Sequence, residues 1–167
     1  FHFRVLSEPG VDLLILYTEA KKKARKLAKK TLNPNALVIL WSDLQVGKVD
    51  SRGGVEELVE RVTATRHRLI DLVKKQKPEK IVFADVGDLI EGFSNAADQH
   101  QLATNQLSIM GQIDLATTLI YDTLKALAGH CDDIAYLTVG SNHCQWRVNN
   151  QKAGSSLDDW GVHVGRT

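Results

Sequence analysis

Carboxylate, amide and imidazole side chains follow three short apolar runs of this 167-residue sequence. The set comprises Asp43 and Gln45 after the first run, Asp88 and Glu91 after the second, and Asn142 and His143 after the third. Carboxylate and amide oxygens are ligands for hard divalent cations, and an imidazole can serve as acid, base or ligand. These residue types therefore indicate metal-assisted or acid–base chemistry, provided that the fold brings them together.

The runs that precede these side chains have the length and composition of buried β-strands, at residues 36–41, 81–86 and 134–139. Between them, apolar residues at helical spacing predict amphipathic helices over 54–76 and 104–128. The order strand, helix, strand, helix, strand predicts an α/β fold with parallel strands joined by right-handed crossovers. Ligand sites in such sheets lie beyond the carboxyl ends of the strands, so we expect the polar groups to converge there.

Three short motifs carry a resemblance to the calcineurin-like metallophosphoesterases. That family has Asp-x-His after its first strand, Gly-Asp-x-x-Asp after its second and Gly-Asn-His-Asp/Glu after its third. The corresponding segments here are Asp43-Leu44-Gln45, Gly87-Asp88-Leu89-Ile90-Glu91 and Ser141-Asn142-His143-Cys144. The resemblance covers roughly residues 36–145 and is greatest to phage-type, exonuclease-like members.

The resemblance implies a metal centre with two divalent ions. Asp43 and Gln45 would bind the first ion, Asp88 would bridge both, and Asn142 would bind the second. The family usually has a histidine where Gln45 stands, and an amide oxygen in that place tilts the preference toward Mn²⁺ or Mg²⁺. We therefore expect Mn²⁺, with Mg²⁺, Fe or Zn²⁺ as alternatives.

The resemblance also implies the catalytic roles. The two ions activate a water for attack on a phosphate ester, and His143 protonates the leaving oxygen, with Glu91 orienting that imidazole. Arg147, after the histidine loop, and His100, in a polar loop, are candidate substrate-binding residues. A surface charge at Arg147 and a solvated histidine at His100 are the plainer alternatives.

The match departs from the family most clearly after residue 145. The family completes its site with further histidines there, and nothing in this segment corresponds to them. We therefore expect the layered α/β/β/α metallophosphoesterase sandwich of the family, with only its N-terminal part present. In this interpretation residues 36–167 are the metallophosphoesterase domain and its C-terminal part is missing.

Basic residues are concentrated near the start of the chain. Residues 21–30 carry seven basic and no acidic side chains, whereas the rest carries 14 basic and 20 acidic ones. This predicts an N-terminal basic helical extension over 1–35. Cys131 and Cys144 form no disulfide framework, and no apolar run is long enough for a membrane span, so we expect a cytoplasmic protein.

These observations favour a metal-dependent phosphodiesterase or nuclease that acts on DNA or RNA, because a basic arm beside an acidic metal site suits a polyanionic substrate. Two alternatives stay open. The chain could be a catalytically degenerate phosphoesterase scaffold that serves as a binding protein, or a nucleic-acid-binding module that uses the basic helix.

Overall fold

The computed structural model describes residues 35–93, 105–148, 151–155 and 158–166. All of them belong to one compact unit, Asn35–Thr167. The predicted basic extension, apart from Asn35, and the candidate substrate residue His100 lie outside the described residues.

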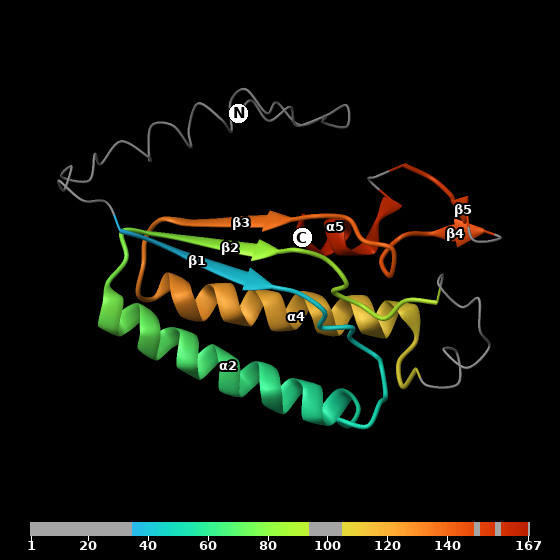
Figure 1. The fold of residues 1–167 in the computed structure, drawn as a ribbon, viewed down its shortest axis with the longest axis horizontal. Coiled ribbons are helices and arrows are strands. Elements are labelled where there is room, and N and C mark those ends of the chain that lie inside the picture. Colours follow the sequence, from blue (N-terminus) through green and yellow to red (C-terminus); the bar gives the residue numbers. More distant parts are fainter. Residues whose placement is uncertain (1–34, 94–104, 149–150, 156–157, 167) are drawn as a thin grey trace. The chain divides into compact units, whose positions relative to one another are not determined.

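A parallel three-stranded sheet forms the centre of this unit (Figure 1). The strands are β1 (Ala36–Trp41), β2 (Lys80–Asp85) and β3 (Ile134–Thr138), in the spatial order β1-β2-β3. The predicted α/β class and the parallel arrangement are confirmed, and each strand lies within one residue of its predicted bounds. A short antiparallel pair, β4 (Arg147–Val148) and β5 (Gln151–Lys152), follows the sheet. The four-layer sandwich stays a prediction.

Two long helices, α2 (Val55–Gln76) and α4 (Ile109–Ala128), cover one face of the sheet (Figure 1). The first helix matches its prediction. The second begins five residues later than predicted, with Ser108 as its N-cap. The reason is that residues 105–106 bind the loop after β1: Asn105 forms an isolated bridge with Lys48, and the next residue donates its backbone N–H to Gly47 O. A third, short helix, α5 (Trp160–Val164), follows β5.

The hydrophobic core fills the layer between the sheet and these helices. Alternate residues of β1 point into it, and the Trp41 and Phe83 rings lie 5.2 Å apart between centroids. The core includes Ile39, Trp41, Leu58, Val62, Phe83, Ile113, Leu119 and Leu127. The other residues of β1 lie on the opposite face, where Val38 is 58% and Leu40 71% exposed. Of the helices that the structure describes, none combines the length and the apolar character needed to cross a membrane.

Candidate functional site

The loops that leave β1 and β2 run side by side beyond the carboxyl end of the sheet. Asp43 N donates to Gly87 O at 3.2 Å, and Gln45 N donates to Asp88 O at 2.9 Å. These bonds bring Asp43, Gln45 and Asp88 onto adjoining backbone segments, at the edge where the parallel topology predicts a ligand site.

All three of these residues have left-handed backbone conformations. The φ angles are +54° at Asp43, +44° at Gln45 and +56° at Asp88, and Gly87 has +116°. Such angles are uncommon for residues with a side chain and cost on the order of 1–3 kcal/mol each. A strained backbone is retained where its surroundings enforce it, and it is concentrated at functional sites. The described chain has one further non-glycine residue with positive φ, Lys77, which ends α2, and the other three are residues of the motifs.

Asp88 carries a buried carboxylate oxygen. Within the described residues, its Oδ1 has no hydrogen-bond partner. Asp43 is exposed, and its Oδ2 accepts a hydrogen bond from Ser42 Oγ at 2.5 Å. A buried anionic oxygen that lacks a donor is costly unless a cation compensates it. The chemistry of these two carboxylates therefore fits a hard divalent cation.

The backbone hydrogen bonds of the described residues that join the segments of Asp43, Gln45 and Asp88 do not include the fourth predicted ligand, Asn142. Asn142 is exposed and its side chain forms no hydrogen bond with the rest of the described chain. In the same residues, no group of three or more His, Cys, Asp and Glu side chains could hold a metal ion. The fit to a cation thus rests on Asp43 and Asp88, with the amide oxygens of Gln45 and Asn142 as the remaining donors of the predicted set.

His143 is held from both of its ring nitrogens. Its Nδ1 donates to Glu91 O at 2.9 Å and lies 3.5 Å from Glu91 Oε2. Its Nε2 lies 3.5 Å from Gln45 Nε2. Donation from Nδ1 to a carbonyl leaves the Nε2 lone pair to accept, which defines the neutral tautomer. Burial raises the pKa of the Glu91 carboxyl, and the imidazole beside it opposes this rise.

Gln45 makes a second contact that the sequence does not predict. Lys48 Nζ donates to Gln45 Oε1 at 2.8 Å. The amide oxygen has two lone pairs, so one remains for a ligand. A cationic ammonium group next to this oxygen nevertheless disfavours a metal ion there. Gln45 is therefore better placed as a bridge from Lys48 to His143 than as a metal ligand.

Arg147 is the candidate substrate residue that lies within the described chain, and it begins β4. Its Nη1 donates to Gln145 Oε1 at 3.2 Å. The neighbouring Trp146 is 56% exposed. The candidate role of Arg147 in substrate binding stays a prediction.

Two amide side chains that sequence reasoning missed, the buried Gln112 and the half-buried Asn105, fix the loop after β2. Gln112 on α4 accepts from Gly92 N at 2.8 Å, and Asn105 Nδ2 donates to Gly92 O at 3.0 Å. Gln112 Nε2 in turn donates to Asn105 Oδ1 at 3.2 Å. The available signal was a glutamine directly before Ile113 on the apolar face of the helix. These hydrogen bonds fix the backbone of Gly92. They thereby fix the position of the preceding residue, Glu91, which contacts His143.

Gly92 lies where the loop after β2 contacts the loop after β3. It has φ +67°, and a Cβ added there would collide with the backbone oxygen of His143. We expect Gly92→Ala to lower the free energy of unfolding by about 1–3 kcal/mol and to displace His143. Urea denaturation measures the first effect. Gly129→Ala is the matched control, because Gly129 has φ −68° and its added Cβ would lie 3.5 Å from the nearest atom. Equal unfolding free energies for the two variants would contradict this account of Gly92.

Two buried aspartates anchor the beginnings of the loops that follow β2 and β3. Asp85, 1% exposed, accepts from Gly87 N at 3.1 Å and from Thr138 Oγ1 at 3.0 Å. Asp159, 2% exposed, accepts from Ser141 N at 3.0 Å and also caps the N-terminus of α5. The loop of Asp88 and the loop of His143 are thus each fixed to a buried carboxylate at its start.

Burial raises the pKa of the Asp85 carboxyl above its ordinary value, against the two hydrogen bonds that lower it. A folded carboxyl that holds its proton more tightly than the unfolded one lowers stability as pH rises from the unfolded to the folded pKa. Asp85→Asn removes this titration, while its amide oxygen can still accept from Gly87 N. We expect the variant to gain stability relative to the wild type as pH rises above about 4.

Urea denaturation at a series of pH values checks this prediction for Asp85. The exposed Asp71 on α2 offers the matched control, Asp71→Asn. A loss of stability in Asp85→Asn that is the same at acidic and neutral pH would show that the hydrogen bonds, and not the buried charge, dominate at this position.

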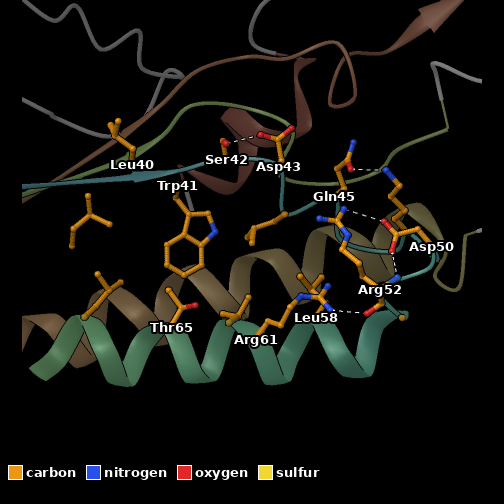
Figure 2. A pocket seen from close by; sticks show the side chains of 16 residues that line it. Leu40, Trp41, Ser42, Asp43, Gln45, Asp50, Arg52, Leu58, Arg61 and Thr65 are labelled. Atoms are coloured by element: carbon orange, nitrogen blue, oxygen red, sulfur yellow. Dashed lines mark hydrogen bonds and ion pairs between the residues drawn. The ribbon is translucent and has the colours of Figure 1, made fainter. Parts of the chain in front are cut away.

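A cavity of about 330 Å³ opens beside the candidate site, between β1 and α2 (Figure 2). Asp43 and Gln45 lie at its rim, and Trp41 forms part of its wall. Its volume is at the lower end of the range of small-molecule sites, about 300–1,000 Å³. The candidate residues therefore adjoin a space that can take a small organic group.

Comparisons with known proteins found no match. No protein-family model, no curated protein and no solved structure matches this chain.

Proposed function

We propose that this protein is a metal-dependent phosphoesterase that hydrolyses phosphate esters. The observation that best supports this is the buried Asp88 Oδ1, which lacks a donor among the described residues and lies in a strained loop beside Asp43. The pairing of His143 with Glu91 adds a proton-transfer group at the same edge of the sheet. The three family-like motifs agree with both features.

Asp43 and Asp88 are the residues that would hold divalent metal ions. Such ions, when bound, offset charge on the phosphoryl oxygens and make a water acidic enough to act as a nucleophile. The chain's own residues supply the general acid. Protonation of His143 at Nε2 gives an imidazolium that the Glu91 carboxylate, 3.5 Å from Nδ1, stabilises. The imidazolium then gives the Nε2 proton to the leaving oxygen, a role that contributes about 10²–10⁴-fold.

A phosphodiester, including one in DNA or RNA, is the substrate class that we favour within this function. The test is Mn²⁺-dependent hydrolysis of three substrates by the purified protein: a nitrophenyl phosphodiester, nitrophenyl phosphate and labelled single-stranded DNA. We expect turnover of the diesters above that of the monoester. Turnover of the monoester alone would agree with the proposed phosphoesterase activity but would exclude the narrower assignment as a phosphodiesterase.

One observation favours the alternative of a binding protein on a degenerate scaffold. Lys48 already binds the Gln45 amide oxygen, which takes up one of the predicted metal ligands. If this alternative holds, Mn²⁺ does not bind at micromolar concentrations and no ester is hydrolysed. The nucleic-acid-binding alternative depends on residues 21–30, which lie outside the described part. Strongly salt-dependent DNA binding without hydrolysis would support it.

A further inference from the structure

The cavity between β1 and α2 is lined on one side by apolar side chains and on the other by charged ones (Figure 2). The apolar wall is formed by Ile39, Trp41, Leu44, Leu58, Val62 and Leu69. The charged end lies toward the candidate metal residues, because Asp43 and Gln45 line the same cavity. A ligand that spans both ends would have an apolar part inside and a polar part at the site.

Trp41 carries a buried donor in this wall that has no partner in the described chain. The residue is only 7% exposed, and in the described chain no group accepts a hydrogen bond from its Nε1. Figure 2 shows the indole between β1 and α2, with its nitrogen toward the end of the cavity that carries Asp43 and Arg61. An indole N–H can only donate. A ligand with a hydrogen-bond acceptor on its edge would satisfy this donor.

Two further side chains of α2, Arg61 and Thr65, add hydrogen-bond donors to the lining of the cavity. Arg61 and Thr65 are four residues apart, so they lie on the same side of the helix. Arg61 uses one of its N–H groups to bind Arg52 O at 3.0 Å, and a guanidinium has five N–H donors in all. Its planar group can also stack on a flat ring. Arg52 is itself paired with Asp50 at 3.0 Å and adds little free charge.

We propose that this cavity binds the flat organic ring of the substrate, a ring with hydrogen-bond acceptors on its edge such as a nucleobase. The ester's phosphate would then lie at Asp43 and Asp88, so this assignment rests on the proposed function. An aliphatic alcohol would leave the Trp41 donor unused. The volume of about 330 Å³ suits a single ring system, so one nucleotide unit enters the cavity and any remaining chain stays outside.

The test measures adenosine binding by isothermal titration calorimetry in metal-free buffer, with ribose as the ring-free comparison. Thr65→Trp places an indole at the cavity, and Thr118→Trp, at an exposed threonine of α4, is the matched control. Trp41→Phe removes the donor but keeps an aromatic ring against Phe83. We expect adenosine to bind and ribose not to bind. Its affinity should fall about 5- to 100-fold in Thr65→Trp and should also fall in Trp41→Phe, while Thr118→Trp is unchanged.

Equal adenosine affinity in Thr65→Trp and Thr118→Trp, or equal binding of ribose and adenosine, would overturn the assignment. The outcome is separable from that of the proposed function, because adenosine carries no phosphate and the buffer no metal. If the protein hydrolyses esters but does not bind adenosine more tightly than ribose, only the assignment of the cavity is contradicted. Adenosine binding that Thr65→Trp abolishes, in a protein without hydrolytic activity, would support a ring site and sink the phosphoesterase.

Discussion

Asp88→Asn is expected to lower Mn²⁺ affinity by at least about 100-fold and to abolish hydrolysis. The amide has nearly the shape of the carboxylate, and asparagine tolerates the left-handed φ of +56° at this position. The variant thus changes charge and little else. Because it removes a buried carboxylate oxygen that has no donor in the described chain, we expect the folded protein to keep or gain stability.

Two measurements on Asp88→Asn separate metal loss from misfolding. Calorimetric titration with Mn²⁺ gives the affinity, and urea denaturation gives the free energy of unfolding. Asp71→Asn, which alters an exposed aspartate of α2, serves as the control and should bind Mn²⁺ like the wild type. Unchanged Mn²⁺ affinity in Asp88→Asn would remove this residue from the metal site.

His143→Ala is expected to bind Mn²⁺ normally and to lose about 10²–10⁴-fold in kcat. The imidazole contacts Glu91 and Gln45, and neither of the candidate carboxylates Asp43 and Asp88 is among its hydrogen-bond partners in the described chain. Its loss should therefore leave metal affinity intact. If it acts as a general acid, the defect depends on the leaving group, because a nitrophenolate departs with little help and an alkoxide needs a proton.

Steady-state kinetics on a nitrophenyl diester and on single-stranded DNA checks the role of His143. The larger loss should appear with DNA, whose leaving group is an alkoxide. His67→Ala, at an exposed histidine of α2, should have wild-type kinetics. Equal losses on both substrates, or a loss of Mn²⁺ affinity as large as that in Asp88→Asn, would contradict the general-acid role.

The elements of the fold could be predicted because their signals are local. Each strand is a short apolar run, and the spacing of apolar residues predicted the start of α2 to within one residue of the observed start. The start of α4 was predicted at 104 instead of 109 because the apolar pattern continues through Leu107, whereas residues 105–106 bind Gly47 and Lys48. That contact joins segments far apart in the sequence, and no local pattern records it.

The candidate site also has features that the sequence predicts and features that it does not. Parallel strands must end at one edge, so the topology alone predicts that Asp43, Asp88 and His143 approach one another. The contact of Lys48 with Gln45 and the anchoring of Gly92 by Gln112 depend on tertiary hydrogen bonds, whose partners a single sequence does not identify. Sequence reasoning also could not foresee the left-handed backbone of Asp43, Gln45 and Asp88, since these residues adopt such angles only where their surroundings impose them.

Hydrolysis of a nitrophenyl phosphodiester in ¹⁸O-labelled water is the most direct test of the central claim. The purified protein is incubated with Mn²⁺, and both products are analysed by mass spectrometry. A metal-dependent phosphoesterase places the label in the phosphate product, in the wild type and not in Asp88→Asn. No metal-dependent turnover, or label found in the nitrophenol, would contradict attack of water at phosphorus at this site.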